Sequence, residues 1–147
     1  MTGVLIIAHA PLAHALRQCA LHVFPDLGRA VVALDVQPNT PPDETLAMAR
    51  AAMRQLDTPQ TLVLTDVFGA TPCNVAQRLV DGVHSSLVTG CNLPMLLRAL
   101  TYRNESLESQ VARALSGGTQ GIMSVAITAP QNQSRRNHDQ DRHDHQQ

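Results

Sequence analysis

Residues 4–16 read VLIIAHAPLAHAL and change character at His9. The apolar run Val4–Ala8 is typical of a parallel strand that is buried on both faces. Directly after the histidine, the pattern predicts a helix over Pro11–Val23. This helix is expected to bury four apolar residues at steps of four, three and four: Leu12, Leu16, Cys19 and Val23. A buried strand that passes at once into a helix predicts an α/β fold, with His9 at the carboxyl end of the first strand.

The same alternation of apolar runs and helical patterns continues along the chain. Further strands are expected at residues 30–36, 61–67, 85–90 and 121–127. Further helices are expected after a capping Thr40, at 72–80 after a capping Thr71, at 92–102, and at 106–115 before Gly117 and Gly118. Strands that alternate with helices over short connections form a mostly parallel sheet with helices on both faces. The prediction is therefore a three-layer, doubly wound domain.

The length of 147 residues fits one compact domain, which we place at residues 1–129. Residues 130–147 form a polar tail that cannot bury a core, so we expect it to be disordered. The tail is rich in histidine. Without a fixed geometry such residues bind metals only adventitiously, so no metal site is expected there.

Composition excludes several classes of protein. The net charge of -1 gives no electrostatic reason to expect nucleic acid or an anionic membrane as a partner. Lysine is absent, which excludes Schiff-base enzymes and P-loop enzymes that grip phosphate with lysine. The first apolar run is too short for a signal peptide or a membrane span, so a cytoplasmic protein is expected. Cys19, Cys73 and Cys91 form no CxxC pair and are expected to be reduced packing residues.

Two polar residues end neighbouring strands of the expected sheet. His9 ends the first strand, and Asp66 ends the third. In the common strand order 2-1-3-4 these strands are adjacent, about 4.8 Å apart, at the edge where open α/β sheets bind ligands. A carboxylate that accepts a hydrogen bond from one imidazole nitrogen fixes the tautomer and leaves a lone pair on the other. The pair therefore predicts a nucleophilic histidine oriented by an aspartate.

The loop after Asp66 is suited to a phosphoryl group. Gly69, Ala70 and Thr71 precede the helix that begins near Pro72, so backbone amides, a hydroxyl and a helix N-terminus meet there. These groups can hold anionic oxygens without a lysine. The interpretation requires no cofactor and no metal.

Three motifs in order resemble the enzyme IIA component of the mannose-type (mannose/fructose/sorbose) phosphoenolpyruvate-dependent sugar phosphotransferase system. They are the strand-ending His9, LVLTDVFGATPCNVA at 62–76 and TGCNLPMLLRAL at 89–100, and the likeness spans residues 1–127. The resemblance implies that His9 accepts a phosphoryl group from the phosphocarrier HPr and passes it to a IIB domain. It assigns the hydrogen-bonding aspartate to Asp66 and the phosphate-binding loop to residues 69–71.

The resemblance also implies the strand order 2-1-3-4 and a homodimer that exchanges a fifth, antiparallel strand, here residues 121–127. Such a protein would meet the membrane only through a transporter complex. The sequence departs from the family pattern at Ala10, Phe68 and Ala70, which stand where the family usually has Gly, Trp and Gly. These changes keep the nucleophile and its partners but alter how closely the backbone approaches phosphate.

Other interpretations stay open. One is a purely regulatory, noncatalytic phosphoprotein whose phosphorylated His9 is read by a partner. Another is a tetrapyrrole metal chelatase, which also begins with a strand-ending histidine. A histidine phosphatase is disfavoured because no arginine precedes His9. Near the same rim, His14 and Cys73 are expected to have surface or packing roles, and Asn74 and Asn92 to be turn or cap residues.

Overall fold

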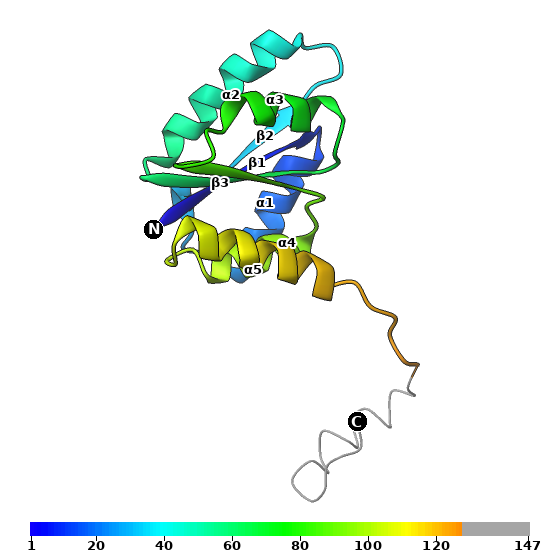
Figure 1. Cartoon of the computed structure of the whole chain (residues 1–147). Coiled ribbons are helices and arrows are strands. Elements are labelled where there is room, and N and C mark those ends of the chain that lie inside the picture. The colour runs from blue at the N-terminus through cyan, green and yellow to red at the C-terminus, as the bar shows by residue number, and fades with distance from the viewer. Residues whose placement is uncertain (128–147) are drawn as a thin grey trace, which may run out of the picture.

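The computed structural model describes residues 1–127 of the chain and contains one sheet of four parallel strands (Figure 1). The strand order is β2-β1-β3-β4, which confirms the predicted α/β topology. The central strand β1 is buried along its length, and its last residue, His9, is exposed. The strands are β1 (Thr2–His9), β2 (Val31–Val36), β3 (Gln60–Thr65) and β4 (Ser85–Thr89).

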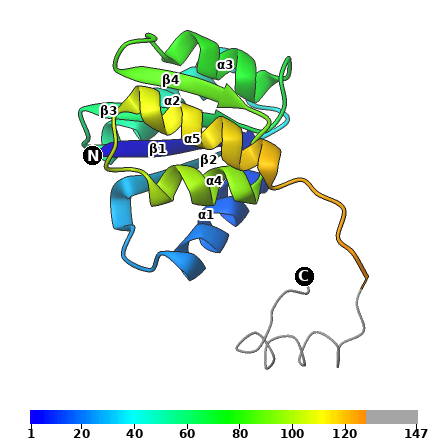
Figure 2. The ribbon, with the colours of Figure 1, turned by 60° about the horizontal axis from the view of Figure 1, so that its bottom comes forward.

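Helices cover both faces of the sheet, as the alternating pattern predicts. In Figures 1 and 2, α2 and α3 lie on one face, while α1, α4 and α5 lie on the other. A short 3-10 turn, Gly28–Ala30, precedes β2. The helices are α1 (Leu12–Val23), α2 (Pro42–Leu56), α3 (Thr71–Leu79), α4 (Leu93–Thr101) and α5 (Leu107–Gln120). The fold is therefore the predicted three-layer, doubly wound domain.

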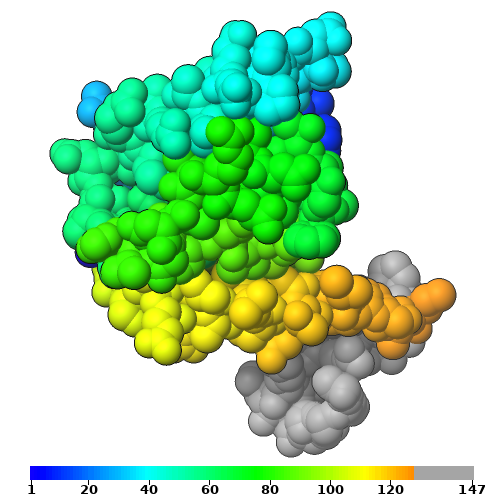
Figure 3. All heavy atoms as spheres, turned by 45° about the horizontal axis from the view of Figure 1, so that its top comes forward, coloured from blue at the N-terminus to red at the C-terminus, as the bar shows by residue number. Residues whose placement is uncertain are grey.

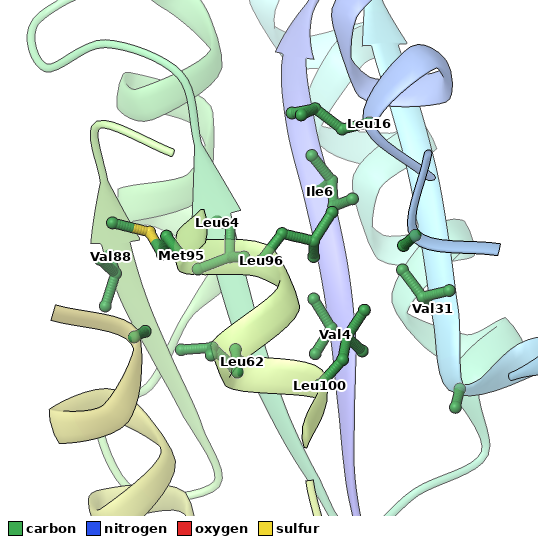
Figure 4. Packing of buried hydrophobic residues seen from close by; sticks show 14 of the residues in the cluster. Val4, Ile6, Leu16, Val31, Leu62, Leu64, Val88, Met95, Leu96 and Leu100 are labelled. Carbon is green, nitrogen blue, oxygen red and sulfur yellow. The ribbon is translucent and has the colours of Figure 1, made fainter. Parts of the chain in front are cut away.

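Alternate residues of β1 supply two separate cores. Val4 and Ile6 face the layer of α1, α4 and α5, and Figure 4 shows Leu96 and Leu100 of α4 packed against them. Leu5 of β1 belongs to the second core, under α2 and α3. Full burial of each such aliphatic side chain contributes about 1.5–3 kcal/mol. Because β1 is held from both faces, the backbone at its carboxyl end is well fixed.

The buried face of α1 differs from the predicted one. Leu16 is buried as expected, but Ala13 and Ala20 are its buried companions. Cys19 and Val23, expected inside, are exposed, as is Leu12, 38% of whose surface is exposed. Periodicity favours the larger apolar residues, whereas the close approach of this helix to the sheet selects small ones.

The α2 cap is also different from the prediction. The N-cap residue is Pro41, and no side chain caps the helix, so Thr40 does not have the expected role. The buried positions of α2 include Leu46 and Leu56. Pro42, at the first helical position, has no N–H, so this end of the helix has one fewer backbone donor without a partner.

Helix α5 continues through Gly117 and Gly118, where the sequence predicted an end, and stops at Gln120. The glycines serve packing against α4. A Cβ atom added at Gly117 would lie 2.5 Å from Arg98 Cβ and 3.2 Å from the carbonyl oxygen of Pro94. A glycine near the end of a helix is therefore ambiguous in sequence, because close helix contact and termination select the same residue.

The segment 121–127 extends away from the body of the domain, shown in orange in Figures 1 and 3. It forms no strand with the chain's own sheet. The expected exchange of this segment with a second copy stays a prediction, because it concerns a partner chain. The expected domain limit at residue 129 and the polar tail 130–147 lie outside the described residues. None of the helices in residues 1–127 has the length and hydropathy to cross a bilayer.

Replacement of Gly117 by alanine tests the close contact between α4 and α5. In an open helix this change stabilises by about 0.5–1 kcal/mol, but here the new methyl group meets Arg98 and Pro94. We expect Gly117→Ala to lower the free energy of unfolding by about 1–3 kcal/mol in urea titrations. The matched control is Gln120→Ala at an exposed position of the same helix, expected within about 0.5 kcal/mol of the parent. A stabilised Gly117→Ala variant would contradict the packing role.

Candidate functional site

The carboxyl end of β1 brings His9 and Asp66 together. The two strands that carry them are paired in parallel, with Ile7 of β1 opposite Thr65 of β3. Asp66 Oδ2 lies 2.7 Å from His9 Nδ1 and accepts a second hydrogen bond from the His9 backbone N–H at 2.9 Å. The side chain of His9 is 53% exposed, and that of Asp66 is 11% exposed. The aspartate is thus an inner anchor, and the imidazole faces outward from it.

The charge of Asp66 is stabilised where it lies. Partial burial alone would raise its pKa, but hydrogen bonds from the His9 backbone and ring, the charge of His9 and the Val67 N–H together hold the pKa below its usual range. The Val67 N–H donates to Asp66 Oδ1 at 2.9 Å. An ionised carboxylate only accepts hydrogen bonds, so Nδ1 of a neutral His9 must carry the proton. The lone pair is then on Nε2, the atom directed away from Asp66.

The loop between β3 and α3 borders this pair. Gly69 has φ of 88°, in the left-handed region that favours glycine. Within residues 1–127, the amides of Gly69 and Ala70 donate to no other group. The loop therefore presents free N–H groups beside the first turn of α3, an arrangement suited to anionic oxygens.

Thr71 is placed differently from the prediction. It is the first residue of α3, and the N-cap residue is Ala70, which has no capping side chain. The predicted capping role of Thr71 is therefore wrong. Its hydroxyl makes no hydrogen bond within the described residues. The hydroxyl is thus not committed to the helix, and it stays available to a ligand at this rim.

The residues that follow β4 lie beside the site and contact the end of β3. Cys91 follows this strand, and its backbone N–H donates to the Thr65 carbonyl at 2.9 Å. Burial, together with the charge of Asp66, raises the pKa of the Cys91 thiol to about 12, so it is a neutral packing group. Asn92 caps α4 by accepting from the Met95 N–H, as expected of a cap residue.

The other residues that the sequence placed near this rim do not join the pair of His9 and Asp66. Cys73 is buried in α3, which agrees with a packing role. Asn74 is exposed within the same helix, so its expected role as a turn or cap residue is wrong. His14, expected on the surface, is exposed but is bound to Asp35 of β2. Sequence reasoning missed that aspartate, although it interrupts an otherwise apolar strand, VVALDV, at the same rim. No cluster of three or more potential metal ligands occurs in the described part of the chain.

Comparison with known proteins identifies the family to which this chain is similar. The family model described as PTS system fructose IIA component matches residues 3–115. The PTS system mannose-specific EIIAB component of Escherichia coli K12 is 31% identical over 96 residues, which are 63% of this chain and 30% of that protein. The Shigella flexneri EIIAB component matches to the same extent. The chain thus spans about a third of the length of these curated relatives.

Solved structures agree on the fold. The phosphotransferase system component EIIA from Streptococcus agalactiae has a TM-score of 0.75 at 22% identity, covering 84% of this chain and 97% of that chain. The mannose/sorbose-specific IIA subunit from Enterococcus faecalis has a TM-score of 0.76 at 22% identity, covering 87% and 97%. At this level of identity the likeness shows the shared fold.

The tautomer of His9 can be measured. We expect the ¹⁵N NMR signals of the His9 ring at about pH 8.5, above the usual histidine pKa of about 6.5, to show a proton on Nδ1 and none on Nε2. In Asp66→Ala the fixed acceptor is lost, and the ring should change to the mixture of tautomers typical of free imidazole. His22, exposed at the end of α1, serves as the internal reference. An Nε2-protonated His9 in the parent protein would contradict the geometry.

Proposed function

Because this chain belongs to the family of mannose-type IIA components of the phosphotransferase system, we propose that it carries a phosphoryl group on His9. Proteins of this kind are phosphotransferases. The proposed donor is the phosphohistidine of HPr. The observation that supports His9 most strongly is the 2.7 Å contact between its Nδ1 and Asp66 Oδ2 at the exposed end of β1.

In the proposed step, the Nε2 lone pair of neutral His9 attacks the phosphorus of the donor. A new N–P bond forms as the donor's N–P bond breaks, and the donor imidazole keeps the released electron pair. Positive charge develops on the His9 ring during the attack. Asp66, already ionised, stabilises that charge through the Nδ1–H and requires no reorganisation to do so. The protein contributes chiefly position and electrostatics.

The loop after Asp66 supplies the partners for the transferred oxygens. We propose that the amides of Gly69 and Ala70 and the hydroxyl of Thr71 donate to them, because these donors have no other acceptor in residues 1–127. This step requires no cofactor or metal. The phosphoryl group adds about -1.5 to -2 of charge at the rim, enough to change how a partner docks.

The surface around His9 is suited to transient contacts. Val67 and Phe68 are exposed by 50% and 72%, and both lie in the loop that follows Asp66. A small exposed apolar patch beside a reactive centre favours a modest, short-lived interface. We propose that HPr docks here in the cytoplasm and that a IIB domain receives the phosphoryl group, with the membrane involved only through a transporter complex. A homodimer that exchanges residues 121–127 is part of the same proposal.

The regulatory alternative shares the first step and differs only in what receives or reads the phosphoryl group. Onward transfer from phosphorylated His9 to a IIB domain separates the two. The chelatase alternative uses His9 as a metal ligand, and membership of a phosphotransferase family favours the phosphoryl reaction over it.

Radiolabelling with phosphoenolpyruvate, enzyme I and HPr tests the assignment. We expect the parent chain to take up acid-labile phosphate rapidly, and His9→Ala to lose this rapid, stoichiometric labelling, because the fixed nucleophile is removed. His22→Ala is the matched control and should label at the parent rate, since His22 lies at the far end of α1. Circular dichroism of each variant checks that the fold is kept. Rapid, stoichiometric labelling of His9→Ala would refute the role of His9.

A further inference from the structure

A second histidine at the same rim is held in nearly the same way as His9. His14, in the first turn of α1, lies with its Nδ1 2.7 Å from Asp35 Oδ2, and its backbone N–H donates to Asp35 Oδ1 at 3.2 Å. The side chains are 64% and 16% exposed, close to the values for His9 and Asp66. In both pairs, one carboxylate holds the amide and the Nδ1 of a single histidine. The consequence is the same: Nε2 is free and directed away from the aspartate.

The two pairs lie on opposite sides of β1. Asp35 of β2 is opposite Ala8, and Thr65 of β3 is opposite Ile7, so Asp66, one residue further on, is level with Ala8 as well. The two carboxylate-bearing strands are therefore two interstrand spacings apart, about 10 Å. A single protein docked on the carboxyl end of the sheet would cover both pairs.

Capping of α1 explains only part of the second pair. The N-cap residue of α1 is Pro11, with no capping side chain, and Asp35 satisfies the His14 N–H from the neighbouring strand. That role needs one carboxylate oxygen. The other oxygen holds the ring of an exposed side chain, which capping does not require. The imidazole contact therefore has another explanation.

Within residues 1–127, His84 also has both contacts with one carboxylate, because its N–H donates to Asp81 Oδ1 at 2.7 Å and its ring faces Asp81 Oδ2, but it differs in its place in the fold. His84 lies before β4, at the opposite end of the sheet, and its Nδ1 is 3.3 Å from Asp81 Oδ2. Asp81 is committed to the turn, because it also accepts from three successive backbone amides. His22 contacts no carboxylate within the described residues. His9 and His14 are thus the two histidines oriented by an aspartate at the rim.

We propose that His14 is a second phosphoryl acceptor, oriented by Asp35. This inference rests on the proposed function, because the donor is the same phosphohistidine that loads His9. The Nε2 lone pair of His14 attacks the donor phosphorus, the donor's N–P bond breaks, and the donor imidazole keeps the electron pair. The Nδ1 proton stays between His14 and Asp35. Since the amides of residues 69–71 lie on the Asp66 side, His14 lacks that cradle and is loaded at least about 10-fold more slowly than His9.

The test locates phosphate by mass spectrometry after labelling with phosphoenolpyruvate, enzyme I and HPr. Arg17 is the first site for trypsin, so the peptide 1–17 carries both histidines. The sample is kept alkaline to preserve phosphohistidine, and fragmentation of this peptide in the mass spectrometer identifies the modified residue. We expect early samples to be modified at His9 and later samples also at His14. His14→Gln should remove the second modification only, and His22→Gln, the matched control, should change neither.

Asp35→Asn distinguishes an orienting role from a structural one. An asparagine can still accept from the His14 N–H through its carbonyl, so the cap of α1 is kept. Its NH₂ group then faces Nδ1, which moves the ring proton to Nε2 and removes the attacking lone pair. We expect labelling at His14 to fall at least about 10-fold, while labelling at His9 in the same sample keeps its rate and shows that the domain is folded.

The possible labelling results test the role of His14, the role of Asp35 and the proposed function separately. Phosphate at His9 alone, even after prolonged labelling, overturns this inference and supports the proposed function. Phosphate at neither residue, with an HPr that loads another acceptor, overturns both. Labelling of His14 that is unaffected by Asp35→Asn overturns the assignment of Asp35 as its orienting partner.

Discussion

The hydrogen bond between Asp66 and the His9 ring is the constraint on which the site depends. It joins two neighbouring parallel strands at the point where both leave the sheet. The carboxylate is mostly buried, and it is held by three donors, the amides of His9 and Val67 and the His9 ring. Its position is therefore set by the backbone of the sheet rather than by mobile side chains. An exposed imidazole gains a fixed tautomer and direction from a partner that is itself fixed.

The packing of β1 explains why this position is reliable. Its buried residues alternate between two aliphatic cores, so helices hold the strand from both faces. A free-standing strand end would move with its loop, but here only the last residue, His9, emerges from the core. The reactive atom belongs to the last residue of a rigid element, which is an arrangement that positions a nucleophile with little loss of conformational entropy on reaction.

The sequence predicts the topology and the principal pair because both follow from simple rules. Apolar runs that alternate with helical patterns determine a parallel sheet, and the carboxyl ends of adjacent strands must meet. The features that the sequence does not predict depend on how closely two helices, or a helix and the sheet, approach each other. The glycines of α5 were interpreted as a helix end, although they admit α4, and α1 buries alanines in place of Leu12 and Cys19. Such choices depend on how near two elements come, which periodicity does not encode.

In the site, too, some residues could be predicted from the sequence and others could not. His9 and Asp66 were identifiable because strand order alone brings them together. The pairing of His14 with Asp35 was missed, because it joins the first turn of a helix to a strand on the other side of β1 and depends on the path of the chain between them. The helix position of Thr71 was also missed, since a cap residue and a first helical residue differ by one place in sequence.

The most direct measurement of the central claim is the position of the phosphorus atom on the His9 ring. Coupling between ³¹P and ¹⁵N in the phosphorylated, ¹⁵N-labelled protein distinguishes the two ring nitrogens. The account predicts phosphorus on Nε2 of His9, with Nδ1 still protonated and bound to Asp66. Phosphorus on Nδ1 would contradict it, because that nitrogen is hydrogen-bonded to Asp66.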